Sequence, residues 1–312
     1  WLAGNFVPPA GIDTTEAPVR PCGQKLRTES LSHTYRAGVP TPVLAIQDVS
    51  VAMAAGSISA LIGPSGSGKT TLVQHLNGLL QPSTGRVILD GHDIWANGNS
   101  HEARRKVGLV FQFPEAQMFE ETVAADVAFG PRNHGCSPEE TTRRVADALA
   151  AVGLPAESFG DRAPLALSGG ERRRAAIAGV LAIAPEVLVL DEPTAGLDPA
   201  NEQLIVDLLQ QLAASGCCVI LVSHDMNRVA ELASQVTVMD AGRVHWHGAA
   251  RAVLEAACSA EEGDHAVVEP PAPLRLTFDL RQQGWNVPTM LTRADVCGFV
   301  SGLQRRALPN SQ

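Results

Sequence analysis

The sequence has few aromatic residues, no excess of basic charge and no apolar run long enough to cross a bilayer. Aromatic side chains make up 4% of its 312 residues, and the formal net charge is −9. Proteins that bind nucleic acid through its phosphates usually carry a basic domain or stripe, so nucleic-acid binding is disfavoured. A spanning helix needs about 20 apolar residues, whereas the best candidate, Ala175–Ala184, is followed at once by Pro185 and Glu186. If the protein serves a membrane, we expect it to do so through partners.

Paired cysteines and a secretory signal are also missing. The six cysteines include no Cys-x-x-Cys pair, and only Cys217 and Cys218 are adjacent. Neighbouring residues of a strand point to opposite faces, so we expect reduced core thiols. The first residues carry no basic region followed by an apolar run, so we expect no signal peptide. Because the chain opens on Trp1 rather than methionine, we expect the recorded N-terminus to be incomplete or misassigned.

Composition divides the chain into three parts. Residues 1–24 are rich in proline, glycine and threonine and lack periodicity, which predicts a disordered leader. Residues 25–250 alternate strand-like and helix-like segments and predict one domain. Residues 251–312 contain an acidic stretch and the proline-rich linker Glu269–Pro273. Beyond this linker we expect a small helical region with two short helices, Leu274–Gln283 and Arg293–Arg305.

The pattern of the central part predicts an α/β fold with a mostly parallel sheet covered on both faces, because short continuous apolar runs alternate with helices. The expected strands are Ile58–Ile62, Val107–Phe111, Val187–Leu190 and Cys218–Val222, with a closing hairpin formed by Val236–Met239 and Val244–Trp246. The expected helices are Thr70–Leu80, Pro138–Val152, Glu171–Ala184 and Ala200–Ala214. Ser137 is a predicted N-cap, and Thr292 with Asp295 has the spacing of a capping box.

A glycine-rich loop lies between the run Ile58–Ile62 and a predicted helix. It matches the phosphate-loop pattern G-x-x-x-x-G-K-[ST] in the strand–loop–helix context that the pattern requires. Glycines let backbone N–H groups turn inward around a β-phosphate at the positive end of the helix. Lys69 adds a charge between the β- and γ-phosphates, and the Thr70 hydroxyl is a ligand for Mg²⁺. The predicted ATP-binding residues of this loop are Gly63, Pro64, Ser65, Gly66, Ser67, Gly68, Lys69, Thr70 and Thr71.

Two carboxylates, Asp191 and Glu192, end the apolar run Val187–Leu190. Alone, such a pair is usually solvated charge at the end of a strand. Next to a phosphate site it favours metal-assisted phosphoryl transfer, in which Asp191 holds Mg²⁺ through water and Glu192 polarises the attacking water. The sequence therefore predicts an ATP-hydrolysing site that uses Mg²⁺.

Three further segments follow in order: Leu-Ser-Gly-Gly-Glu-Arg-Arg at 167–173, Glu-Pro-Thr-Ala-Gly-Leu-Asp at 192–198 and Ser-His-Asp at 223–225. They resemble the signature motif, the run from catalytic glutamate into the D-loop, and the switch histidine of ABC (ATP-binding cassette) ATPases. The resemblance covers about Lys25–Gly248. It implies a P-loop ABC ATPase domain that adds an antiparallel β subdomain and a helical signature subdomain to the sheet, with a short C-terminal helical appendage.

The resemblance also implies roles for single residues. Tyr35 falls where an aromatic ring stacks on adenine, although a plain core or surface position suits this single tyrosine as well. The implied catalytic residues are Glu192, His224, Gln112 and Asp198, and the implied metal ligands are Thr70, Gln112 and Asp191. The residues implied to contact ATP in trans, on a second subunit, are Ser168, Gly169 and Gly170.

Finer matches narrow the family. The segments 108–123, 172–179 and 193–199 resemble those of ATPases from energy-coupling-factor (ECF) importers, which take up vitamins or transition-metal ions. In that family two ATPases bind one transmembrane coupling protein, and a separate membrane subunit captures the substrate. The resemblance implies a peripheral subunit on the cytoplasmic face of the membrane, paired with an identical or related ATPase. Met118 and Phe119 would line a groove for a coupling helix, with simple core packing as the alternative.

Other functions remain open at this point. The ATPase of a conventional ABC importer or exporter shares every catalytic motif and differs only in its membrane partner. A soluble ABC ATPase of DNA maintenance or translation is less favoured, because neither a long coiled-coil insertion nor a second cassette appears. A P-loop kinase or GTPase needs neither the Leu-Ser-Gly-Gly turn nor the downstream histidine.

Overall fold

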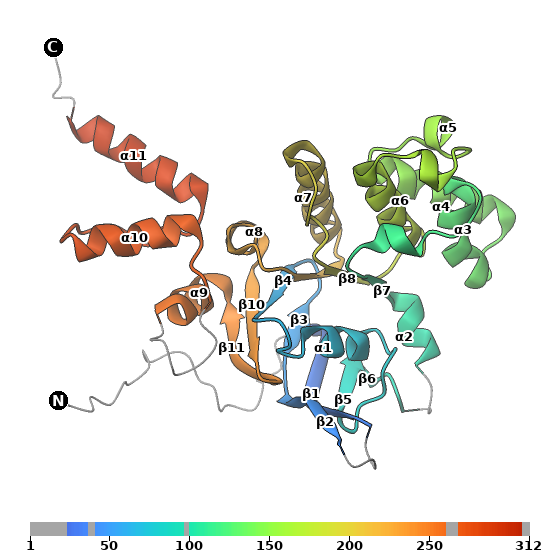
Figure 1. Ribbon diagram of the computed structural model, residues 1–312, viewed down its shortest axis with the longest axis horizontal. Helices are drawn as coiled ribbons and strands as arrows, with labels where there is room; N and C mark the ends of the chain where they lie inside the picture. Colours follow the sequence, from blue (N-terminus) through green and yellow to red (C-terminus); the bar gives the residue numbers. More distant parts are fainter. Residues whose placement is uncertain (1–23, 37–40, 97–99, 260–267, 308–312) are drawn as a thin grey trace.

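The computed structural model describes residues 24–36, 41–96, 100–259 and 268–307 of the chain. Its centre is a six-stranded sheet with the order β11-β10-β4-β9-β8-β7, in which only the hairpin strand β11 is antiparallel to its neighbour (Figure 1). The strands are β4 (Ile58–Ile62), β7 (Val107–Val110), β8 (Val187–Asp191), β9 (Cys218–Val222), β10 (Gln235–Asp240) and β11 (Arg243–Ala249). The predicted mostly parallel α/β sheet is therefore confirmed.

A second, antiparallel sheet has the order β2-β1-β5-β6, with β3 paired to β1. Its strands are β1 (Gln24–Tyr35), β2 (Val43–Val49), β3 (Ala52–Ala54), β5 (Thr84–Leu89) and β6 (His92–Asp93). This sheet is the antiparallel β subdomain that the resemblance implied. The predicted leader, residues 1–24, lies outside the described residues except for Gln24, which begins β1.

The two faces of the central sheet have different covers. Side chains alternate between the faces of a strand, so Leu188 and Leu190 pack against helices α3 (Val123–Asn133), α4 (Pro138–Ala151), α6 (Gly169–Leu181) and α7 (Pro199–Ala214). Val187 and Val189 pack instead against the antiparallel sheet and α1 (Lys69–Leu76). Helices thus cover one face as predicted, whereas the other face is covered mainly by the second sheet.

Helix ends differ from the prediction by up to four residues, for local reasons. Ser137 caps α4 as predicted, since its hydroxyl accepts a hydrogen bond from Glu140 N at 3.2 Å. Helix α1 ends at Leu76 rather than Leu80, because Gly78 adopts a φ of +74° and the Asn77 side chain donates to the Val107 carbonyl at 2.6 Å. The remaining short elements are α2 (His101–Lys106), η1 (Pro114–Gln117), α5 (Ala156–Phe159), η2 (Pro164–Ala166) and α8 (Met226–Leu232).

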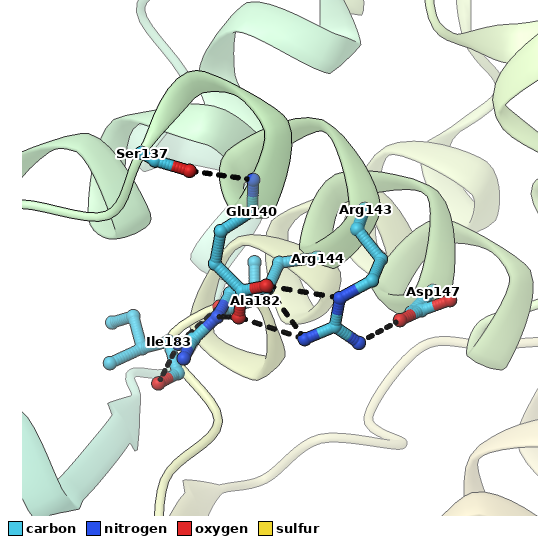
Figure 2. A network of polar contacts seen from close by, with 7 residues as sticks. All are labelled: Ser137, Glu140, Arg143, Arg144, Asp147, Ala182 and Ile183. Carbon is cyan, nitrogen blue, oxygen red and sulfur yellow. Dashed lines mark hydrogen bonds and ion pairs between the residues drawn. The ribbon is translucent and has the colours of Figure 1, made fainter.

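A charged cluster fastens α4 to the end of α6 (Figure 2). Arg144 donates to the Glu140 carboxylate at 2.6 Å and to the Ile183 carbonyl at 3.0 Å. Arg143 bonds to Glu140 as well and reaches Asp147 at 3.0 Å. The last carbonyl groups of a helix have no partner within the helix. Arg144 supplies one, and it thereby fixes the C-terminal end of α6 within the helical subdomain.

Within the described C-terminal residues, three helices follow the central domain. The predicted C-terminal helices are α10 (Ala272–Gln282) and α11 (Arg293–Ala307), and α11 begins with the expected box, in which Thr292 Oγ1 accepts from Asp295 N at 3.2 Å. Helix α9 (Ala250–Ser259) was not predicted, and it packs Val253 and Leu254 against β10. Among the described residues, no helix is long and apolar enough to span a membrane.

The turn of the β10–β11 hairpin supports the glycine-rich loop from behind. Gly242 N donates to the Ser67 carbonyl at 3.1 Å, and a Cβ placed on Gly63 would lie 2.0 Å from the Met239 carbonyl oxygen. Gly63 also has a φ of +141°, which side chains rarely adopt. The loop is therefore held by backbone contacts that leave no room for a side chain at Gly63.

We expect Gly63→Ala to destabilise the fold much more than Gly66→Ala. The first change forces Cβ into a backbone carbonyl, a clash of the kind that costs about 1–3 kcal/mol or more. At Gly66 no atom lies within 4 Å of the added Cβ, so only the left-handed backbone costs about 1–2 kcal/mol. Thermal unfolding followed by circular dichroism measures both changes, and equal losses of stability would contradict the packing argument.

Candidate active site

Positive backbone angles shape the phosphate loop. Gly63, Gly66 and Gly68 have φ values of +141°, +80° and +98°, and Gly68 leads directly into α1. Ser65 and Gly66 are exposed at the tip of the loop. Inward-turned N–H groups at the start of a helix form a concave site for anions. The predicted loop residues are therefore contiguous, with Pro64, Ser65, Gly66 and Thr70 exposed and Ser67 and Thr71 buried.

The Lys69 ammonium folds back across this loop. Its Nζ donates to the carbonyl oxygens of Gly63 and Pro64, each at 2.8 Å. Burial lowers the pKa of Lys69, and the charges of Asp191 and Glu192 partly oppose that decrease. Anionic phosphate oxygens are stronger acceptors for an ammonium than carbonyl oxygens, so a bound phosphate can replace the carbonyl groups.

Strand β8 brings the acidic pair to the same edge of the sheet. Burial raises the pKa of Asp191, repulsion by the Glu192 carboxylate raises it further, and Lys69 acts in the opposite direction. A nearby cation would stabilise the charged form of this half-buried carboxylate. Mg²⁺ prefers oxygen ligands, and the Asp191 carboxylate and the exposed Thr70 hydroxyl both supply them.

Glu192 is held in an unusual backbone conformation. Its φ is +51°, a left-handed value that costs a residue other than glycine about 1–3 kcal/mol. Its N–H donates to the Val222 carbonyl of β9 at 3.0 Å, and its carboxylate accepts from His224 Nδ1 at 2.7 Å. Since β8 and β9 are neighbours in the parallel sheet, their ends bring the predicted pair Glu192 and His224 into direct contact.

Two further predicted residues lie near these groups. Tyr35, at the end of β1, is half-buried and its hydroxyl lies 3.3 Å from Thr71 Oγ1 on α1. The Tyr35 ring also meets the ring of His33 edge-on at 4.5 Å. Gln112 is exposed and follows β7, the strand beside β8. Tyr35 is thus next to the phosphate loop, and Gln112 lies at the same edge of the sheet as the acidic pair.

The Ser168-Gly169-Gly170 turn belongs to a different part of the molecule. Ser168 caps α6 in a capping box, since its hydroxyl accepts from Glu171 N at 3.3 Å and its N–H donates to the Glu171 carboxylate at 2.8 Å. Ser168 and Gly169 are exposed. Helix α6 packs on α3 and α4, whereas α1 packs on β1 and β2, so the two motifs lie on separate subdomains (Figure 1).

Asp198 lies with that turn rather than with the phosphate loop. Its carboxylate caps α7 by accepting from Ala200 N at 3.0 Å and Asn201 N at 3.1 Å. Asn201 in turn lies so close to Gly170 that a Cβ there would come within 2.9 Å of its amide nitrogen. Sequence reasoning missed Asn201, because nothing local indicates that it meets a residue 31 positions earlier.

The two residues of the predicted partner groove differ in how far they are buried. Met118 is half-buried and packs against the core. Phe119 is 65% exposed, and its ring meets that of Phe129 edge-on at 4.9 Å. Sequence reasoning did not identify Phe129, nor the buried Arg173, which binds the Glu115 carboxylate through two hydrogen bonds of 3.1 Å.

Comparisons with known proteins agree with this geometry. The sequence profile of the ABC transporter family matches residues 46–195. The chain is 47% identical over 274 residues to the energy-coupling factor transporter ATP-binding protein EcfA2 of Symbiobacterium thermophilum, covering 86% of this chain and 92% of the relative. The chain belongs to the family of energy-coupling factor transporter ATP-binding proteins. The family interpretation drawn from its motifs is thereby confirmed.

Two solved structures confirm the ABC ATPase fold. CbiO1 from Clostridium perfringens, part of the ABC transporter complex CbiONQ, is 35% identical with a TM-score of 0.66, covering 76% of this chain and 95% of that one. The ATP-binding cassette MJ0796, solved as a dimer in a post-hydrolysis state with ADP and Pi, is 29% identical with a TM-score of 0.64, covering 72% and 99%. This member of the family is accordingly an ATPase that binds and hydrolyses ATP.

We expect Asp191→Asn to stabilise the nucleotide-free protein at neutral pH. The folded-state pKa of Asp191 is raised, so its charge weakens the fold above that pKa and has no effect below the unfolded value of about 4. The gain in melting temperature should therefore be present at about pH 8 and vanish near pH 4.

Asp90→Asn is the matched control with the opposite sign. Burial would raise the pKa of Asp90, but its bond to Lys25 and the charges of Lys25 and Lys106 outweigh burial and lower it. Its charge stabilises the fold above the unfolded pKa, and this contribution is lost as the pH falls through the folded pKa. The variant should thus melt at a lower temperature at about pH 8. A loss of stability in both variants would contradict the assignment for Asp191.

Proposed function

We propose that this chain powers an ECF-type importer for a vitamin or a transition-metal ion, through ATP-dependent closure with a second ABC ATPase that is identical or related. Its partners are a transmembrane coupling protein and a membrane subunit that captures the substrate. They hold the chain at the cytoplasmic face of the membrane. Residues 25–250 form the ATP-binding domain, and residues 251–312 form the C-terminal appendage.

The separation of the signature turn from the phosphate loop is the observation that supports this proposal most strongly. Ser168 and Gly169 are exposed at the start of the 13-residue helix α6. The capping box pairs the N–H groups of Ser168 and Glu171, and the N–H groups of Gly169 and Gly170, which have no acceptor within the helix, favour an anion. The chain's own phosphate loop lies on another subdomain (Figure 1). An anion bound by this turn is therefore the terminal phosphate on a second subunit, and ATP joins the two surfaces.

Within its own site the chain binds the nucleotide through the phosphate loop and Tyr35. Lys69 exchanges its bonds to the carbonyl groups of Gly63 and Pro64 for bonds to phosphate oxygens. Tyr35, fixed beside α1 by its contact with Thr71, presents its ring to the adenine base.

The hydrolytic step rests on Glu192. Its carboxylate accepts the proton of the attacking water, while the 2.7 Å bond from His224 Nδ1 fixes its orientation. Thr70, Gln112 and Asp191 are the residues that would hold Mg²⁺, which when bound neutralises charge on the phosphates. Gln112 contacts the γ-phosphate from the neighbouring strand, and Asp198, beside the signature turn, connects the two sites. Loss of the terminal phosphate removes the bridge, and the pair of subunits opens.

The surface beside Gln112 is suited to the membrane partner. Phe113, Phe119 and Phe129 leave 53%, 65% and 43% of their area exposed. Exposed aromatic side chains in one region commonly mark interaction sites. A coupling helix bound there, with Met118 at the inner edge, would move with the segment that follows Gln112.

We expect Glu192→Gln to bind ATP normally and to hydrolyse it at least about 100-fold more slowly, because an amide cannot accept the proton. The closed dimer should accumulate with ATP and be detected by size-exclusion chromatography with light scattering. Lys69→Ala is the control, since it should abolish tight ATP binding instead. Normal turnover of Glu192→Gln would defeat the role of Glu192.

We expect a pull-down with this chain from solubilised membranes to recover a coupling protein and small substrate-binding membrane subunits, identified by mass spectrometry. Phe119→Ser should weaken recovery of the coupling protein by about tenfold or more, the effect of losing an aromatic anchor. Leu276→Ser is the control, because Leu276 is an exposed apolar residue on α10. Recovery of a fused importer or exporter subunit instead would contradict the ECF-type role.

A further inference from the structure

A single buried guanidinium connects three segments of the ATPase. Arg173 lies on α6, five positions after Ser168, and only 5% of its side chain is exposed. Its Nε and Nη2 donate to the two carboxylate oxygens of Glu115, each at 3.1 Å. Its Nη1 donates to the carbonyl oxygen of Ala195. The guanidinium carbon also lies 5.6 Å from the centre of the Phe113 ring.

The pair is charged and specific in geometry. Burial alone would raise the pKa of Glu115, but the bond from Arg173 outweighs burial and the pKa is lowered. A forked pair of parallel hydrogen bonds requires the planar guanidinium, and lysine cannot reproduce it together with a third bond to a carbonyl group. The contact therefore fixes the positions of Glu115 and Ala195 relative to α6, in addition to pairing two opposite charges.

The segments that Arg173 joins are those that contain the reacting groups. Phe113 and Glu115 lie one and three residues after Gln112, and Phe113 has a left-handed φ of +55°. Ala195 lies between Glu192 and Asp198, and its own N–H donates to the Glu192 carbonyl at 3.3 Å. Arg173 thus connects both sides of the chain's own nucleotide site to the helix that begins with the signature turn.

We propose that Arg173 is a positioning residue that couples the two nucleotide sites of the ATPase pair. When the chain's own site is filled, any displacement of the Gln112 segment reaches α6 through Glu115 and Arg173, and so alters the turn that acts on the second subunit. Coupling of this kind is reciprocal. The inference rests on the proposed two-subunit closure, and it assigns the cooperativity of that closure to one side chain.

Arg144, on α4, provides a matched control because it contacts the other end of α6. It also bonds a glutamate carboxylate, at 2.6 Å, and a backbone carbonyl, that of Ile183, at 3.0 Å (Figure 2). Its contacts lie at the C-terminal end of α6, whereas those of Arg173 lie near the signature turn. A general loosening of α6 would affect both variants alike, but loss of coupling should follow only from Arg173.

The test uses the transporter complex purified through a tag on the full chain, with ATP hydrolysis titrated against ATP. Arg173→Lys should lower kcat about tenfold to 100-fold, as small misplacements do, and bring the Hill coefficient towards unity. KM should change by less than about threefold, because the phosphate loop is untouched. Glu115→Gln, at a position that is 22% exposed, should shift both quantities the same way. Because it leaves a buried guanidinium without its charged partner, its melting temperature is measured beside that of Arg173→Lys. The double variant should be no worse than the more affected single variant, since both changes break one contact.

The results separate this inference from the proposed function. If the wild type hydrolyses ATP cooperatively and Arg173→Lys does so unchanged, the inference is overturned but the proposed function is not. Additive effects of Glu115→Gln and Arg173→Lys would overturn it as well, and so would the same loss of cooperativity in Arg144→Lys. Non-cooperative hydrolysis by the wild-type complex, unaffected by Glu192→Gln in this chain, would overturn both.

Discussion

The charge balance between Lys69 and the pair Asp191 and Glu192 is the interaction on which the rest of the site depends. One ammonium and two carboxylates meet where β4 and β8 end, and burial lowers the pKa of the ammonium and raises that of Asp191. Parallel strands bring such groups to one edge of a sheet, so the α/β topology is what assembles the site. The surplus of negative charge suits a cation that enters with the nucleotide, and the same cation would offset the charge of the phosphates.

Much of this arrangement could be predicted from the sequence, because the phosphate loop and the acidic strand end are contiguous motifs with local geometry. The bond between His224 and Glu192 was not predictable in detail, but both residues follow buried apolar runs, and runs of that kind become neighbouring strands. Ser168 was predicted as part of the signature turn. Its capping box then explains why α6 begins at Gly169, two residues before the predicted start.

Other features depend on contacts between residues far apart in the sequence. Arg173 and Glu115 are 58 residues apart, and in the sequence Arg173 is one of three consecutive arginines. Helix α9 was missed because Val253 and Leu254 form only a short apolar stripe, which is stabilised by packing on β10. Tertiary packing of this kind commonly determines where short helices form. The second face of the central sheet packs mainly against the antiparallel sheet. The apolar pattern of a strand shows that a face is buried, but it does not show which element buries it.

The hairpin turn behind the phosphate loop has a consequence for how the enzyme tells its substrate from its product. Because Gly242 and Met239 hold the loop against the sheet, the cradle is pre-formed, and ordering entropy is not lost when nucleotide arrives. A rigid cradle shaped to the part that ADP and ATP have in common retains either one with similar strength. Discrimination between ATP and ADP therefore depends on the groups around the third phosphate.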